Sequence, residues 1–195
     1  STGIDVTGTA TMDGLTVEGI AEISSTTPTL RFFETDQTDE GTLLRSAGDS
    51  FQIAKMLDTG AADGIRLAID QSSGDISFYE DTGTTPKFFW DASAESLGIG
   101  TSSPVSELDV AGITPTLTIK DTQNKSWTSS DTTLGELAFR ISDASGIGAH
   151  NVAFVRAVND ITSSSTPSGA LSFGVAPNNS NASEAMRIDS SGNVG

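Results

Sequence analysis

Residues 69–76 read IDQSSGDI, and residues 188–194 repeat this stretch as IDSSGNV with one residue deleted. In both copies Asp precedes Ser and Gly, and apolar residues stand on either side. An Asp side chain accepts hydrogen bonds from the backbone that follows it, and Gly adopts the positive φ that tight connections need. The stretch therefore predicts a chain reversal between two β-strands. A looser third copy runs from Trp90 to Leu97 and Gly98.

Outward from these turns, apolar residues alternate with small or polar ones, which is the period of a half-buried strand. The alternation is clearest over residues 64–69, 135–141, 151–158 and 169–175. Residues 49–57 are the best candidate for a helix, and they are equally compatible with a strand. The sequence therefore predicts an all-β fold. Short strands separated by Gly, Ser, Asn and Pro are typical of small β-sandwich-like or prism-like modules.

A longer repeat divides the chain. Residues 27–30 read TPTL and residues 114–117 repeat the same letters, and each copy leads into an apolar and acidic stretch. This repeat predicts two β modules. The first spans residues 27–113 and ends in a GIGTSSP junction, and the second spans residues 114–195 and is truncated where the next junction would begin.

A shorter repeat appears before the first module. The pattern apolar, polar, apolar, any residue, Gly occurs at residues 4–8 and 15–19, and again at residues 108–112. Its apolar pair lies on one face of a short strand, which the Gly ends. Residues 1–26 are therefore expected to form a stalk of short stacked strands, similar to a β-helix or β-prism. Because so thin a chain cannot bury this face alone, we expect three copies around one axis, an elongated homotrimeric fibre.

Composition limits the partners of such a protein. The formal net charge of −16 repels phosphate backbones and anionic lipid surfaces, so neither nucleic acid nor membrane insertion is expected. Only 35% of the residues are hydrophobic and 6% are aromatic, which suits a slender or oligomeric protein better than a wide monomeric core. The absence of Cys excludes disulfides and thiolate metal sites.

Few residues point to catalysis or to metal binding. His150 is the only imidazole and no nucleophile elbow occurs, so a surface or trimer contact is the favoured interpretation of this residue. The acidic residues mostly stand beside Gly, Ser or Thr, which favours turn capping over paired catalytic carboxylates. The closest acidic run, residues 58–64, lacks the spacing and the closing Glu of an EF-hand loop. We therefore expect no catalytic, cofactor or metal-binding residues, and no enzyme.

Ligand contacts are expected in the polar loops of the second module, because loops carry binding residues at low structural cost. Trp127 is the aromatic residue expected to be most exposed, and Lys125 stands close beside it. An amphipathic ring of this kind stacks on sugars. Asn178 and Asn181, in the Asn- and Ser-rich loop 177–184, are the other candidate contacts.

The junction and the second module resemble the repeat-containing shaft of bacteriophage tail fibres. Residues 95–104 read ESLGIGTSSP, with LDV at residues 108–110, and this order is similar to the GIGT-S-P junctions of those fibres. The stretches that resemble the module between two junctions are residues 114–117 (TPTL), 134–139 (LGELAF), 142–146 (SDASG) and 184–195 (EAMRIDSSGNVG). The similarity covers most of residues 91–195.

The resemblance implies an extracellular homotrimeric shaft that is attached to the virion through other tail proteins and meets a polysaccharide or protein receptor on the bacterial surface. Many members of this family end in a self-cleaving chaperone domain, whose catalytic residues have no counterpart in this sequence. The expected function is structural and adhesive: a trimeric shaft and spacer for host attachment, with glycan binding by the second module. Two alternatives stay open, namely a polysaccharide-degrading tailspike-like enzyme and a non-viral bacterial adhesin or extracellular filament.

Overall fold

The computed structural model describes residues 7–9, 14, 16–39, 41–122, 130, 132–160 and 168–195. These residues form strands and connections with no helix among them, which confirms the all-β prediction. They separate into two compact units, the first ending at Thr116 and the second beginning at Leu117. The described part of the chain accordingly has no helix that could cross a membrane.

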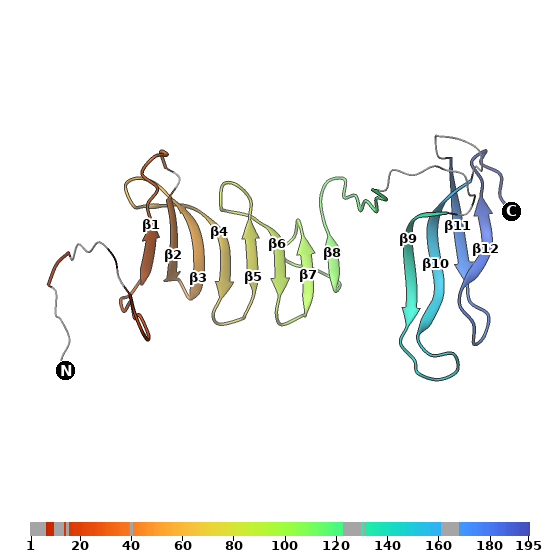
Figure 1. Cartoon of the computed structure of the whole chain (residues 1–195), viewed down its shortest axis with the longest axis horizontal. Helices are drawn as coiled ribbons and strands as arrows, with labels where there is room; N and C mark the ends of the chain where they lie inside the picture. Colours follow the sequence, from red (N-terminus) through yellow and green to blue (C-terminus); the bar gives the residue numbers. More distant parts are fainter. Residues whose placement is uncertain are drawn as a thin grey trace. The chain divides into compact units, whose positions relative to one another are not determined.

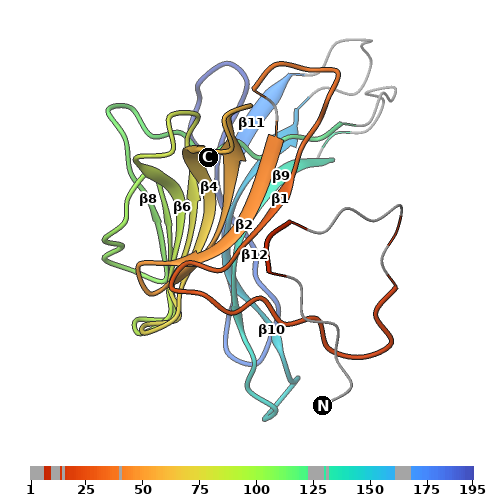
Figure 2. The ribbon, with the colours of Figure 1, turned by 90° about the vertical axis from the view of Figure 1, so that its left-hand side faces the viewer.

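The described residues of the first unit form one eight-stranded sheet, in which each strand pairs with its neighbours in sequence (Figure 1). Pairing is antiparallel from β1 to β7, and β8 joins β7 in parallel. Figure 2 shows β2, β4, β6 and β8 fanning across a single layer, as expected from the twist between neighbouring strands. The strands are β1 (Thr29–Phe32), β2 (Gly41–Ala47), β3 (Ser50–Met56), β4 (Ala62–Asp70), β5 (Ile76–Tyr79), β6 (Pro86–Asp91), β7 (Ser96–Ile99) and β8 (Leu108–Val110).

The described residues of the second unit form a four-stranded antiparallel sheet in the order β12-β11-β10-β9. Its strands are β9 (Thr133–Ile141), β10 (His150–Asn159), β11 (Gly169–Val175) and β12 (Ser183–Ile188). In such a meander the first and third connections leave the sheet at the same end. Residues 142–149 and residues 176–182 are therefore brought together, although they lie far apart in the sequence.

The four strands expected from alternation are confirmed, because they lie within β4, β9, β10 and β11. Residues 49–57 contain β3, so the strand interpretation of this stretch is correct and the helix interpretation is wrong. Asp49 has a φ of 58°, which places it in the tight turn that enters β3 rather than in a helix. Among its described residues each unit has a single sheet, not the two packed sheets of the expected sandwich-like modules.

The stalk expected over residues 1–26 stays a prediction, because it was expected to form between three copies of the chain. Residues 16–26 form no strand, whereas the copy of the same repeat at residues 108–110 forms β8. β8 has β7 beside it, with Leu97 opposite Leu108. A strand of three residues has no stability by itself, and the described N-terminal residues lack such a neighbour within the chain.

The predicted Asp-Ser-Gly reversals are tight turns in the structure. Oδ1 of Asp70 accepts hydrogen bonds from the backbone N–H groups of Ser72 (2.8 Å) and Ser73 (2.9 Å). Asp91 repeats this pattern, and Asp189 accepts from the residues two and four positions later. The Ser72 hydroxyl, followed by these N–H groups, lowers the pKa of Asp70 to about 2. The turns are thus held by ionised carboxylates at neutral pH.

The junction after β7 depends on two glycines. Gly100 has a φ of 80°, and a Cβ there would lie 2.2 Å from the carbonyl oxygen of Ala111. A Cβ at Gly98 would lie 2.3 Å from the carbonyl oxygen of Thr101. This close approach lets the Ala111 N–H donate to the Ile99 carbonyl at 2.9 Å, which extends the pairing of β7 with β8.

The first unit buries one small hydrophobic cluster, made of Leu43, Ala54 and Met56 on one face of β2 and β3. A reciprocal pair of hydrogen bonds fixes the connections that flank these strands. The Asp39 N–H donates to Oδ1 of Asp58 at 3.0 Å, and the Asp58 N–H donates to Oδ1 of Asp39 at 2.9 Å. Among the described residues, the buried hydrophobic cluster of this unit therefore lies on one face of the sheet.

Candidate functional site

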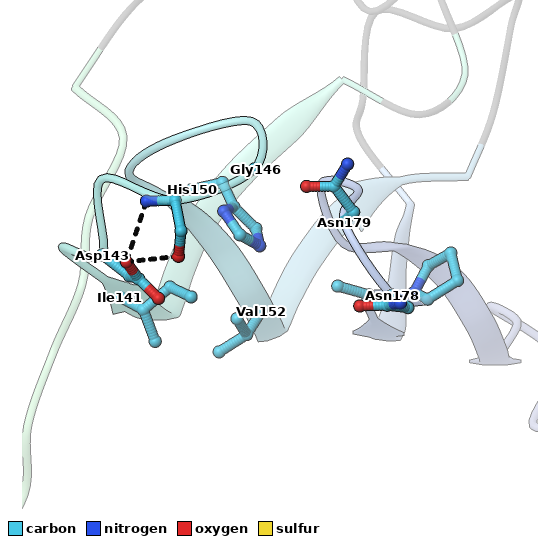
Figure 3. A pocket seen from close by; sticks show the side chains of 10 residues that line it. Ile141, Asp143, Gly146, His150, Val152, Asn178 and Asn179 are labelled. Carbon is cyan, nitrogen blue, oxygen red and sulfur yellow. Dashed lines mark hydrogen bonds between the residues drawn. The ribbon is translucent and has the colours of Figure 1, made fainter.

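A cavity of about 570 Å³ lies at the end of the four-stranded sheet where the two connections meet (Figure 3). One wall comes from the β9–β10 connection, residues 142–149, and the other from the β11–β12 connection, residues 176–182. Its volume is within the range of small-ligand pockets. The lining combines apolar residues with five polar ones, which are Asp143, Ser145, His150, Asn178 and Asn179.

The two walls of this cavity are locked together by one side chain. The carboxamide oxygen of Asn179 accepts a hydrogen bond from the Ile147 N–H at 2.9 Å. Gly146, with a φ of 64°, makes this possible, because a Cβ there would lie 2.0 Å from that oxygen. A backbone hydrogen bond from Ala176 to Val152, 2.9 Å long, ties the second connection to β10 as well. The cavity is thus a built feature of the fold.

Asp143 supplies the negative charge of the cavity. Its Oδ1 accepts hydrogen bonds from the Ser145 N–H (2.8 Å) and the Ser145 hydroxyl (2.6 Å), the two dashed lines in Figure 3. The hydroxyl and the N–H of Ser145 lower the pKa of Asp143, and the nearby His150 adds to this effect. The carboxylate is therefore ionised at neutral pH and available as a hydrogen-bond acceptor.

His150 opens β10, is half-buried and lines the same cavity. Its Nδ1–H donates to the Gly148 carbonyl oxygen at 2.6 Å, since a carbonyl oxygen can only accept. The Ser145 hydroxyl donates to Asp143 and not to the imidazole. This arrangement differs from the Ser–His pair of a hydrolase, in which the imidazole accepts the hydroxyl proton.

Of the predicted ligand contacts, Asn178 lines the cavity. Asn181 is exposed in the same connection but is not part of the lining. Trp127 and Lys125 lie outside the described residues. Their part in ligand binding stays a prediction.

Four polar residues of the cavity were not among the expected ligand contacts, namely Asp143, Ser145, His150 and Asn179. A signal for the first two exists, because residues 142–146 read SDASG and repeat the letters of the hairpin turns. Nothing in the sequence shows that this turn faces the loop with Asn179, 36 residues after Asp143, since only the strand order brings the two connections to one end.

The acidic run at residues 58–64 has other partners. The Asp58 carboxylate accepts the Asp39 N–H, and the Asp63 carboxylate lies 3.8 Å from the Lys55 ammonium. Within the described ranges, no group of three or more His, Cys, Asp or Glu side chains is arranged to hold a metal ion.

The eight-stranded sheet has an uncovered apolar face. Directly paired residues share a face of a sheet, and one unbroken row of paired residues crosses all eight strands. Every member of this row, which we call the apolar ladder, is hydrophobic and none is buried. The apolar ladder consists of Leu30, Leu44, Ile53, Leu67, Phe78, Phe88, Ile99 and Val110.

A second apolar row runs beside the ladder from β3 to β8, again with no buried member. The opposite face is different, since it holds the buried cluster of Leu43, Ala54 and Met56. The small or polar residues Gln52, Ala68, Ser77 and Ser96 are buried there as well. The second row consists of Phe51, Ile69, Ile76, Trp90, Leu97 and Leu108.

The four-stranded sheet also has an exposed apolar row, although its buried hydrophobic residues Phe154, Val158 and Ala170 lie on the other face. One face carries the row Leu137, Val155, Phe173 and Met186, one apolar residue from each strand. The row on the other face is Glu136, Arg156, Ser172 and Arg187. There Arg156 lies 3.6 Å from Glu136, and Arg187 pairs with Glu184 at 2.8 Å. Leu137 is 52% exposed and Met186 is 38% exposed, so the apolar face is again uncovered.

Neither a family model nor a curated protein matches the chain. The structural observations that bear on its function are the cavity of the second unit and the apolar face of each sheet.

Proposed function

We propose that this chain is a structural and adhesive segment of a bacteriophage tail fibre, in which three copies form a shaft and spacer for attachment to the host surface. It acts outside the cell as part of the virion, bound to other tail proteins, and it is not an enzyme. The observation that carries the proposal is the uncovered apolar face of each sheet. A single-layer sheet with one apolar face needs a second layer, and further copies of the chain supply it.

The energetics favour association through these faces. Covering apolar surface stabilises a complex by roughly 25 cal/mol for each Å² removed from water. Contiguous apolar patches beyond a few hundred Å² are rare on monomeric proteins and mark interaction surfaces. The apolar ladder contains no charged residue. Despite the net charge of −16, two copies can therefore meet at the ladder without placing like charges in contact. The similarity of residues 91–195 to tail-fibre modules supports the same interpretation.

The cavity supports an adhesive role for the second unit. Its carboxylate, carboxamides and imidazole offer several hydrogen-bond donors and acceptors beside the apolar wall of Ile141 and Val152. Such a combination suits a hydroxyl-rich ligand, and we assign the cavity to a sugar unit of the host surface polysaccharide. Three weak sites on one rigid trimer would bind a polymer more tightly than one site alone, through effective concentration.

Light scattering on the native protein tests the proposal. The expected mass is about three times the chain mass of 20.1 kDa, and a monomeric mass would overturn the shaft assignment. Attachment is tested by incubating the labelled protein with bacteria, with an excess of purified capsular or outer polysaccharide as competitor. If the labelled protein binds none of the bacteria tested, the adhesive part of the proposal is overturned.

The alternatives give different results. A polysaccharide-degrading enzyme would release reducing ends from capsule during such an incubation, and none are expected. A non-viral adhesin would also form oligomers and bind surfaces, so inhibition of phage adsorption by the purified protein separates it from a tail fibre.

A further inference from the structure

We infer that the apolar ladder and its second row form the interface between copies of this chain, and that in the trimer they face the threefold axis while the opposite face of the sheet points outward. This inference rests on the proposed function and names the surface that it uses. It commits to a second copy of the same chain as the occupant of the face.

The apolar ladder and its second row form a long surface. Eight strands spaced about 4.8 Å apart give a ladder about 34 Å long, and the second row widens it by about 7 Å. A small ligand would cover only a part of such a strip. Covering the whole strip requires an apolar surface of equal length, and the same strip on another copy of the chain is such a surface.

The two faces of a single strand differ in exposure. In β6, Phe88 belongs to the ladder and is 39% exposed, whereas Phe89 belongs to the opposite face and is less exposed. In β5, Phe78 is 47% exposed, whereas Ser77 beside it is 9% exposed. In β5 and β6 the large apolar side chains of the ladder are therefore more accessible than their neighbours on the opposite face. This inversion of the usual order indicates that the ladder is covered in the functional assembly.

Two aromatic side chains of the ladder are fixed by contact with each other. The rings of Phe78 and Phe88 meet edge to face, with centroids 5.2 Å apart and an interplanar angle of 86°. Both rings are thus positioned by a contact within the chain before any partner arrives. A surface that is already ordered loses little side-chain entropy on association.

Neither apolar row contains a charged residue, so a partner must meet these rows with an apolar surface rather than with opposite charge. The same rows on a second copy of the chain are such a surface. A second copy brings the same net charge, but the side chains of its ladder and second row are uncharged. The charges of the copies then remain in water, where salt screens them.

A matched pair of substitutions on β6 tests the inference. The Phe88→Asp variant should lose the trimer in light scattering, whereas Phe89→Asp, one residue away on the opposite face, should keep it. Circular dichroism of both variants reports whether the β structure is retained. If the native protein is a trimer and Phe88→Asp stays fully trimeric, the inference is wrong while the proposed function stands.

A second pair of substitutions introduces no charge, so its result does not depend on whether a charged variant folds. The chain has no Cys, so Phe88→Cys and Phe89→Cys each carry a single thiol. In an isolated chain the thiol at position 88 is the more exposed of the two. In the native assembly we expect the reverse, with maleimide labelling at least tenfold slower at position 88 than at 89.

The labelling rates and the native mass together distinguish a failure of the interface from a failure of the shaft. Faster labelling at position 88 in a native trimer would overturn the inference alone. A native monomer would overturn both the inference and the proposed shaft. A native dimer with a protected position 88 would support the ladder as the interface and overturn the threefold shaft.

Discussion

The side-chain oxygen of Asn179 accepts the backbone N–H of Ile147 at 2.9 Å, at a place where residue 146 leaves no room for a Cβ. This contact joins the two connections that form the cavity of the second unit. Gly146→Ala would place its Cβ 2.0 Å from that oxygen, in a backbone with a φ of 64°. We expect a loss of about 1–3 kcal/mol in the free energy of unfolding, from backbone strain and loss of the hydrogen bond.

Gly148→Ala is the matched control for this variant. Gly148 also has a positive φ, of 81°, but nothing lies within 4 Å of the position of its Cβ. Gly148→Ala should therefore lose stability through backbone strain alone, without the steric contact. Denaturant titration should find it less destabilised than Gly146→Ala. Equal destabilisation would mean that the contact with Asn179 contributes nothing.

Sugar binding by the cavity depends on the side chains that line it. His150→Ala and Asn178→Ala should each weaken binding of a host oligosaccharide by about two- to tenfold, the value of one hydrogen bond. Asn181→Ala, in the same connection but outside the lining, should bind as the native protein does. Titration followed by NMR or calorimetry measures the three affinities. An equal effect of all three substitutions would contradict the assignment of the cavity.

Strands and turns could be predicted from the sequence because both depend on local chemistry. Alternation of apolar residues sets the strands, and the carboxylate of Asp70 together with the Gly that follows sets the hairpin turn. The short N-terminal copies of the repeat were expected to behave like residues 108–110. Residues 16–19 of the second copy form no strand in the single chain, because pairing of a three-residue strand depends on a neighbour and not on its own sequence.

The site was harder to predict for a related reason. Asn178 was a candidate because its loop is polar, but Asp143 reaches the same cavity only through the order of the four strands. The apolar ladder has the same character. Each hydrophobic residue is visible in the sequence, whereas their alignment into one row depends on the register of seven strand pairs, to which bulges beside Ile53 and Phe78 contribute.

The charged face of the second sheet should make its stability depend on pH. The Arg187 guanidinium and then the Ser172 hydroxyl hydrogen-bond to Glu184 and lower its pKa to about 2. A carboxylate with a depressed pKa contributes stability above its unfolded value, near 4.5, and this contribution is lost as the pH falls toward 2. After solvent screening we expect roughly 1 kcal/mol or less.

Comparison with Glu184→Gln isolates this contribution from that of the other acids. The native protein should be the more stable above pH 5, and the difference should vanish near pH 2. Denaturant midpoints measured from pH 6 to pH 2 give the two curves. A difference that stays constant over this range would show that ionisation of Glu184 does not stabilise the fold.

The pairing of β8 with the rest of the first sheet depends on Gly100. A Cβ there would lie 2.2 Å from the Ala111 carbonyl oxygen, so Gly100→Ala must push the chain after β8 away from β7. The Ala111 N–H then loses its hydrogen bond to Ile99, and its amide hydrogen should exchange at least tenfold faster. Gly112→Ala is the control, because nothing lies within 4 Å of its Cβ position. Since β8 adds Val110 and Leu108 to the apolar rows, Gly100→Ala should also weaken the trimer, and Gly112→Ala should not. If the Ala111 amide hydrogen exchanges equally fast in both variants, the contact at Gly100 is not the cause of the faster exchange.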